Sequence, residues 1–380
     1  MVRGSAAKYQ LDRIAAQGIV AVSMGFRLGR LGYFAHPALA AEAPEDLRGN
    51  YGYMDQLAAL KWVQRDIGAF GGDPNKVTIF GGSAGGGSVL AHLVSPMSRG
   101  LFHRAILQAP GSPGPRAGSI PSSDLVKAEA IAVAWATSVG ITGEGSSALE
   151  QMRALPIDKL IAGLSLKETL VALASDSTPP GMAMSIIDGR FLAERPEVAL
   201  AAGRQAKVPV IVGANDREMA IGNAGSKDEL FAKFGPDADA ARRVYDPRGD
   251  QTLDELNQQV SADGLLVEPA RHLANEVARS GQPVWLYRFE YVSEAFRGGV
   301  MGALHGFEIP FTLNVPAALV GQKVTPTDKA MADVVSAYWV SFGMNGDPNG
   351  GGRPHGRSTT PPSTASCTSR TLDSWSAPIP

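Results

Sequence analysis

The stretch that decides the fold is Val77-Thr78-Ile79-Phe80-Gly81-Gly82-Ser83-Ala84-Gly85-Gly86-Gly87. Its apolar, β-branched beginning predicts a buried strand, and the helix-like segment 88–94 that follows predicts a helix. The G-x-S-x-G spacing between them predicts a sharp turn, because glycines on both sides of Ser83 let the chain reverse while the serine takes a strained conformation. The turn would hold the Ser83 hydroxyl clear of the sheet, where the Ala84 amide, at the start of the helix, could face a developing oxyanion.

Glycine-rich turns after strands also have other uses. A phosphate-binding Walker loop requires a lysine after its second glycine, but here Gly86 is followed by Gly87 and Ser88. The dinucleotide-binding spacing G-x-G-x-x-G does not fit either, since position 83 is Ser and position 90 is Leu. A turn with a purely structural role remains open on the motif alone.

The composition is that of an ordinary globular protein, with 380 residues, 44% of them hydrophobic and 19% charged. A net charge of −2 gives no reason to expect nucleic acid or an anionic membrane as a partner. No apolar run reaches the roughly 18 residues that a membrane helix needs. Cys367 is the sole cysteine, so no intrachain disulfide is possible, and no oligomeric state is predicted.

The first residues contain no apolar segment typical of a signal peptide, so a cytoplasmic location is the default expectation. A core-like run, Ile19–Met24, follows within about twenty residues of Met1. A chain that reaches its core so early is expected to lack some sequence upstream.

Short apolar runs alternate with helical patterns along the chain. The candidate strands are Ile19–Met24, Val77–Phe80, Arg104–Gln108, Val208–Gly213 and Pro283–Phe289. Their continuous apolar character is typical of strands buried on both faces of a parallel sheet. The alternation predicts an α/β fold with a doubly wound, mostly parallel sheet.

Among the helical patterns, Tyr53–Phe70 is a clear candidate that ends at a Gly-Gly-Asp-Pro turn, and a last helix is predicted after Thr325-Pro326. Residues 120–180 and 224–280 are interpreted as helical insertions on the carboxyl side of the sheet. Residues 1–352 therefore form one predicted domain. Residues 353–380 form a tail rich in Ser, Thr and Pro that is expected to stay disordered.

A nucleophilic serine needs a base, and the base needs a third group to orient it. His305 lies in a glycine-flanked loop after the last candidate strand, where a catalytic histidine belongs if the chain order is serine, acid, histidine. Asp216 and Glu218 both follow the strand before it, and the residues alone do not choose between these two acids.

Several longer motifs resemble the type-B carboxylesterase/lipase family, the cholinesterase-like α/β-hydrolases. They are Asn50-Tyr51-Gly52-Tyr53-Met54-Asp55-Gln56-Leu57, Phe70-Gly71-Gly72-Asp73-Pro74, Leu101-Phe102-His103-Arg104-Ala105-Ile106-Leu107-Gln108 and Ala303-Leu304-His305-Gly306-Phe307-Glu308. The resemblance covers roughly residues 10–350. It implies an α/β-hydrolase fold and a small-molecule ester substrate, with Ser83 as nucleophile, Glu218 as acid and His305 as base, and it implies no metal or cofactor.

The sequence departs from the family pattern in ways that bear on activity. Gly82 stands where the family commonly has Glu, and Met219 stands where it usually has Gly. The family's His-Gly-Gly-Gly loop, whose amides supply most of the oxyanion hole, has no counterpart before residue 18, which leaves the Ala84 amide. An esterase of reduced activity, an inactive fragment and a non-catalytic interaction protein therefore stay open as alternatives.

Overall fold

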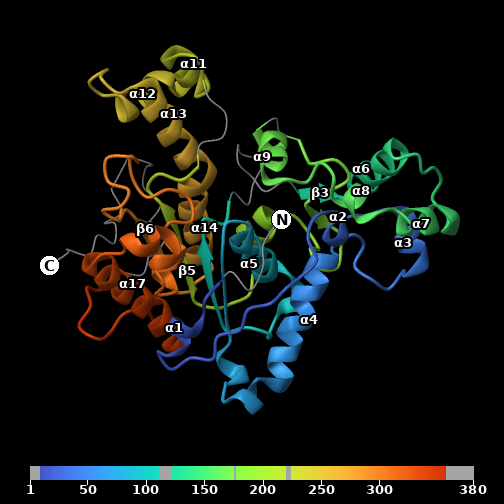
Figure 1. Ribbon diagram of the computed structural model, residues 1–380, viewed down its shortest axis with the longest axis horizontal. Coiled ribbons are helices and arrows are strands. Elements are labelled where there is room, and N and C mark those ends of the chain that lie inside the picture. The colour runs from blue at the N-terminus through green and yellow to red at the C-terminus, as the bar shows by residue number, and fades with distance from the viewer. Residues whose placement is uncertain (1–8, 112–121, 175–176, 220–223, 357–380) are drawn as a thin grey trace. The chain divides into compact units, whose positions relative to one another are not determined.

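The computed structural model describes residues 9–111, 122–174, 177–219 and 224–356 (Figure 1). The chain divides into two compact units. The first contains residues 1–79, 87–105 and 119–207, and the second contains residues 80–86, 106–118 and 208–380. Residues 353–356 of the predicted tail form no helix or strand, and the rest of the tail, with Cys367, lies outside the described residues.

A four-stranded sheet has the strand order β1-β2-β5-β6. Its strands are β1 (Thr78–Gly82), β2 (Arg104–Gln108), β5 (Val210–Asn215) and β6 (Val284–Phe289). β5 and β6 are parallel, in a register that pairs Val210 with Val284 and Asn215 with Phe289. Together with the helices between the strands, this confirms the predicted α/β class, and the arrangement is consistent with an α/β-hydrolase fold.

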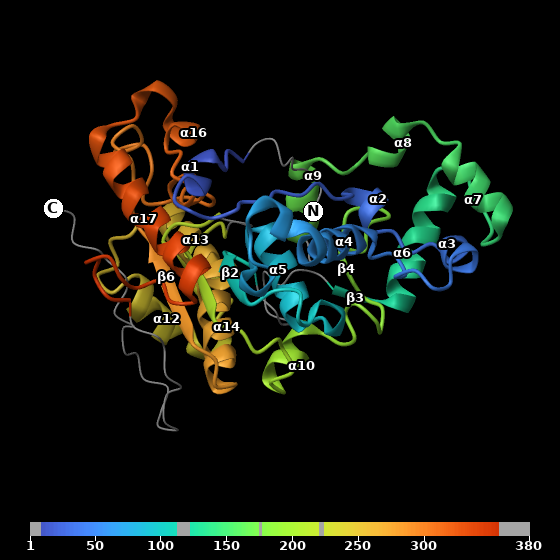
Figure 2. The same cartoon turned by 90° about the horizontal axis from the view of Figure 1, so that it is seen from below.

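Helices cover both sides of β6 within the second unit. α14 (Glu268–Arg279) packs along β5 and β6, and α17 (Pro326–Asn345) lies on the other side of β6 (Figures 1 and 2). The α17 side is aromatic: the Tyr287 and Trp339 rings meet edge to face with centroids 5.3 Å apart. Residues 224–280 are therefore more than the predicted insertion, because their last helix belongs to a layer of the fold.

The bounds of β5 differ from those predicted. The sequence places the strand at Val208–Gly213, with Gly213 as its end, whereas β5 continues through Gly213 to Asn215. The glycine is needed inside the strand, since a Cβ atom there would lie 2.2 Å from the Tyr287 carbonyl oxygen and 2.4 Å from its ring. Gly213 thus marks a close approach of β6 rather than a turn.

The cap of α17 holds a buried carboxylate. Thr325 and Asp328 form a reciprocal capping box, and Pro326 takes the first helical position, as predicted. The same Asp328 carboxylate also accepts hydrogen bonds from the Tyr291 hydroxyl at 2.8 Å and the Ser293 hydroxyl at 3.0 Å. One buried side chain therefore joins the start of α17 to the segment after β6.

Replacing Asp328 with alanine should lower the free energy of unfolding by about 4 kcal/mol. The change leaves two buried hydroxyl donors without an acceptor, at about 1–3 kcal/mol each, and removes the acceptor of the Thr325 N–H in the capping box, worth about 1 kcal/mol. Urea denaturation measures the difference. Asp333→Ala, an exposed change in the same helix, is the control and should cost little. Equal losses in the two variants would contradict the role given to Asp328.

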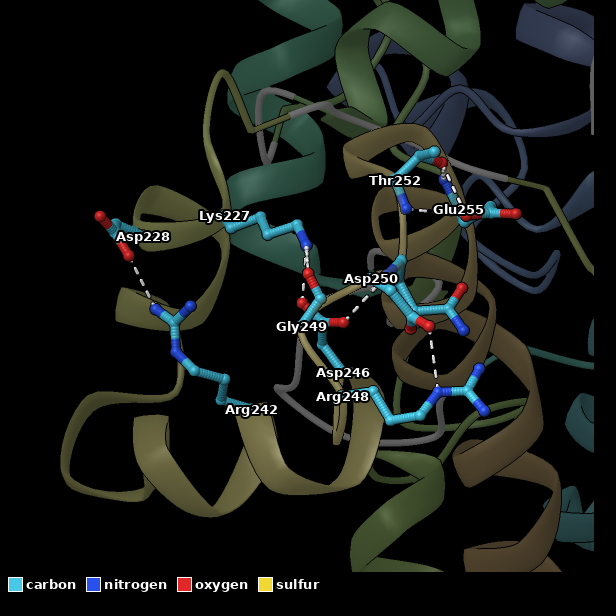
Figure 3. Close-up of polar contacts among 10 residues, drawn as sticks. Lys227, Asp228, Arg242, Asp246, Arg248, Gly249, Asp250, Thr252 and Glu255 are labelled. Atoms are coloured by element: carbon cyan, nitrogen blue, oxygen red, sulfur yellow. Dashed lines mark hydrogen bonds and ion pairs between the residues drawn. The ribbon is translucent and has the colours of Figure 1, made fainter.

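The remaining helices of the second unit include a compact group, α11 (Lys227–Ala232), α12 (Ala238–Tyr245) and α13 (Leu253–Ala262), shown in Figure 3. Lys227 Nζ binds the buried Asp246 carboxylate at 2.7 Å and the Gly249 carbonyl oxygen at 3.0 Å. The start of α11 is thereby fixed to the loop after α12. A π-helix, Asp263–Val267, then leads into α14, and α15 (Ile309–Thr312) and α16 (Ala317–Val320) precede α17.

Helices also dominate the first unit. They include α1 (Asp12–Ala15), α2 (Gly29–Gly32), α3 (Pro37–Glu42), α4 (Tyr51–Asp66), α6 (Leu125–Ser138), α7 (Ser146–Arg153), α8 (Ile157–Ile161), α9 (Leu166–Ala174) and α10 (Pro196–Ala201). Two short parallel strands, β3 (Ser122–Asp124) and β4 (Ser185–Ile187), pair with each other. No helix in the described ranges is both long and apolar enough to cross a membrane.

The predicted strand at Ile19–Met24 is wrong: these residues belong to no helix or strand. Val20 and Val22 are each 43% exposed and Met24 is 37% exposed, so alternate side chains of the run face outward. An apolar run becomes a buried strand only when a neighbouring strand pairs with it, and the described residues provide none.

Candidate functional site

The predicted strand–turn–helix around Ser83 is present, since β1 ends at Gly82 and α5 (Ala84–Val94) begins directly after the serine. Ser83 has φ 55°, a left-handed conformation that is rare for a residue other than glycine. Its N–H donates to the Gln108 carbonyl oxygen at 2.8 Å. The strain that the G-x-S-x-G pattern predicts is therefore found at the serine itself.

The glycines beside Ser83 are required by close backbone contacts. A Cβ atom at Gly81 would lie 2.6 Å from the Gly85 carbonyl carbon, and one at Gly86 would lie 2.8 Å from the Gln108 carbonyl oxygen. A Cβ atom at Gly82 would lie 2.9 Å from Ile309 Cδ1. The departure from the family's glutamate at position 82 thus accompanies an isoleucine side chain in the adjoining space.

His305 lies in a tight turn whose geometry requires the glycine at position 306. The Phe307 N–H donates to the Leu304 carbonyl oxygen at 3.0 Å, so His305 and Gly306 are the two central residues. Gly306 has φ 82°, as the third residue of a type II turn requires. The backbone of this four-residue turn fixes the direction from which the imidazole leaves the chain.

The structure separates the two candidate acids. Glu218, which is fully buried, accepts a hydrogen bond from His305 Nδ1 through one oxygen and from the Asn215 N–H, at 2.8 Å, through the other. Asp216 instead accepts a hydrogen bond from the Ala303 N–H at 2.8 Å. Glu218 is therefore the carboxylate in contact with the imidazole, and Asp216 binds the backbone of the histidine loop.

Ser83 is joined to the histidine loop through Gln108 rather than directly. Among the described residues, none forms a hydrogen bond with the buried Nε2 atom of His305. Gln108 accepts the Ser83 N–H through its carbonyl oxygen and donates its side-chain N–H to Glu308 Oε1 at 3.2 Å. The second unit thus contains all three predicted residues. Within the described residues, the Nε2 atom of His305 has no hydrogen-bond partner.

Burial and charge shift the pKa values of two groups here. Burial works against a charged His305 ring, but the Glu218 hydrogen bond and the nearby carboxylates outweigh it, so the pKa of His305 lies above its ordinary value. Burial, with a contribution from the negative charge of Glu218, raises the pKa of Glu308 to about 7. The site therefore contains, beside an imidazole with a raised pKa, a second carboxyl group whose pKa is close to neutral.

Glu308 should make the folded chain less stable as the pH rises from about 5 to 8. Its pKa is raised from 4.5, so the folded state holds this proton more tightly than the unfolded state does. The stabilisation is complete below about pH 4.5 and is lost as the pH passes through about 7, a change of about 3 kcal/mol. Urea denaturation at pH 5 and pH 8 measures the change in the free energy of unfolding, which should be smaller in the Glu308→Gln variant than in the unsubstituted chain. The change that remains in the variant comes from His305, whose raised pKa causes a further loss of stability above pH 6.5. An unchanged slope would contradict the prediction.

Sequence reasoning overlooked the residues that join the loops, namely Gln108, Asn215 and Glu308. Gln108 and Glu308 lie inside the family motifs quoted above, but no local spacing shows that their side chains meet. His92, a buried histidine of the first unit, hydrogen-bonds to Gln56 and Ser98 of the same unit. In the part of the chain that the structure describes, no group of three or more His, Cys, Asp or Glu side chains is placed to hold a metal ion.

Comparison with known proteins gives the chain its family. The model of the carboxylesterase family matches residues 1–239 and 227–372. A fumonisin B1 esterase of Sphingopyxis macrogoltabida and a cocaine esterase of Homo sapiens are each 33% identical to the chain, over 368 and 382 residues. Each of these matches covers 93% of this chain and 64% of the relative, so the chain spans less than two thirds of the relatives' length. An acylcarnitine hydrolase of Rattus norvegicus is also 33% identical, over 89% of this chain and 61% of the relative. Because the family match extends over nearly the whole sequence, the chain belongs to the carboxylesterase family.

Proposed function

We propose that the chain is a serine hydrolase that cleaves carboxylic esters, with Ser83 as nucleophile, His305 as base and Glu218 as acid. The observation that carries the proposal is the Glu218–His305 hydrogen bond, made through Nδ1, which leaves Nε2 without a hydrogen-bond partner among the described residues. This is the arrangement in which a carboxylate orients an imidazole that accepts a proton through its other nitrogen. Relatives named as esterases and hydrolases support the same reaction class.

In the proposed mechanism, His305 Nε2 takes the proton of the Ser83 hydroxyl as its oxygen attacks the ester carbonyl carbon. The Ala84 N–H, at the start of α5, stabilises the negative oxygen that forms. His305 then gives the proton to the departing alcohol, which leaves an acyl group on Ser83. Water attacks this acyl-enzyme with His305 again acting as base, and the carboxylic acid is released.

The buried Glu218 carboxylate has two effects in this reaction. It fixes the imidazole in the tautomer that carries its proton on Nδ1, and it stabilises the positive charge that the ring gains. Its second oxygen is held by the Asn215 N–H, so the carboxylate cannot rotate without losing a hydrogen bond.

Hydrolysis of p-nitrophenyl acetate by the purified chain tests the function, together with fluorophosphonate labelling followed by mass spectrometry of the labelled peptide. We expect turnover and one labelled serine, at position 83. A folded protein that neither hydrolyses the ester nor reacts with the probe would overturn the proposal and favour a non-catalytic role. Labelling without turnover would indicate an activated serine in an impaired esterase, because the probe needs the nucleophile more than a complete oxyanion hole.

A further inference from the structure

Asn215, at the end of β5, contacts both the acid and the loop of the base. Its backbone N–H donates to Glu218 Oε1 at 2.8 Å. Its side-chain Nδ2 donates to the Leu304 carbonyl oxygen at 2.6 Å and to Glu308 Oε2 at 2.7 Å. The residue is fully buried, so water cannot replace these contacts.

The two side-chain contacts lie on either side of His305 in sequence. Leu304 immediately precedes the histidine, and Glu308 follows it by three residues. Apart from the Glu218–His305 bond itself, the described loops are joined by bonds from Arg217 N–H to Ala303 O at 3.1 Å and from Ala303 N–H to Asp216 Oδ1, and both of these end at residue 303. Asn215 is thus the side chain that holds the histidine turn from both ends.

We propose that Asn215 is a positioning residue that keeps the His305 imidazole aligned with Glu218, an inference that rests on the proposed function for its kinetic consequence. Its amide supplies two hydrogen-bond donors to two oxygen acceptors, while its own N–H holds the acid. An aspartate of the same shape would retain the backbone bond to Glu218 and lose both side-chain donors. Its oxygens would then face the Leu304 carbonyl and the Glu308 carboxyl group, which favours movement of the histidine turn.

The test compares Asn215→Asp with Asn257→Asp. Asn257 is a matched control, because it is also buried in the second unit and its side chain also bridges backbone groups, the Ala224 carbonyl and N–H, at 3.1 and 2.9 Å. Two readouts are measured for each protein: kcat and KM on p-nitrophenyl acetate, and the far-downfield proton NMR signal of the His305 Nδ1–H. The signal is assigned by its absence from a His305→Gln variant.

In Asn215→Asp we expect kcat to fall by about 10²-fold with little change in KM, since a small displacement of a reacting group has an effect of this size. The downfield signal should shift or disappear. Asn257→Asp should keep kcat and the signal, even if it unfolds at a lower urea concentration. If Asn215→Asp does not fold, Asn215→Ala replaces it, because that change removes the same two donors without adding a charge.

Wild-type kcat together with an unchanged downfield signal in the Asn215 variant would overturn the proposal. Equal changes in both readouts for the Asn215 and Asn257 variants would also overturn it, because they would show a general effect of losing a buried amide. The NMR signal separates this inference from the proposed function. A wild-type chain without esterase activity whose signal is lost in Asn215→Asp and kept in Asn257→Asp would support the alignment while contradicting the catalytic role.

Discussion

Replacing Ser83 with alanine is expected to abolish both ester hydrolysis and fluorophosphonate labelling. Removing the nucleophile of a serine hydrolase lowers kcat on the order of 10⁶-fold, which would place any remaining turnover near the background. The fold should persist, although the left-handed backbone at this position is no easier for alanine than for serine. Rates on p-nitrophenyl acetate and labelling by the probe, at equal concentrations of folded protein, measure the effect.

Ser88→Ala is the matched control for that change. Ser88 lies one helical turn further along α5 and is buried. It should retain both the turnover and the labelling of the unsubstituted chain. Labelling that survives in Ser83→Ala and disappears in Ser88→Ala would identify Ser88 as the nucleophile and contradict the assignment of Ser83.

The second large effect is expected from Glu218→Gln. Loss of the carboxylate that orients the histidine of a catalytic triad lowers kcat by about 10⁴-fold, because the imidazole is left in the wrong tautomer. The pKa of His305 should also fall, since burial then acts on the ring without the hydrogen bond and charge of Glu218 to oppose it. The acidic limb of kcat/KM should therefore move to lower pH.

Glu276→Gln provides the control for Glu218→Gln, because Glu276 is a buried glutamate of the same unit that is paired with Arg279 in α14. It should leave the rate and the pH profile unchanged. If Glu218→Gln retained the rate of this control, the hydrogen bond between Glu218 and His305 would have no catalytic importance. Another group would then have to orient the imidazole.

The sequence predicts the fold class and the serine turn well, because both depend on local patterns. The glycines at positions 81 and 86 are needed by backbone contacts within a few residues or at the next strand, and the G-x-S-x-G spacing records that need directly. The same is true of the α17 cap, where Thr325, Pro326 and Asp328 act within one helical turn. Structural requirements set by residues close in sequence can therefore be predicted from local sequence patterns.

Features that depend on distant neighbours could not be predicted in this way. Gly213 looks like a strand end, but its reason lies 74 residues away, in the Tyr287 backbone and ring of β6. The link from Asn215 to Leu304 depends likewise on the pairing of β5 with β6. The run Ile19–Met24 shows the reverse case, since strand-like residues remain unpaired when no neighbour is available.

The parallel pairing of β5 with β6 has a consequence for how the chain acquires its site. Val210 and Val284 must close a connection of 74 residues before the first hydrogen bond between these strands can form. Closing so long a connection costs chain entropy that nearby contacts do not repay, and such pairings form slowly. Helical circular dichroism should therefore return early in refolding. The Glu218–His305 contact, made by loops that follow these two strands, should return with the slowest phase, so that the refolding chain is helical well before its acid and base meet.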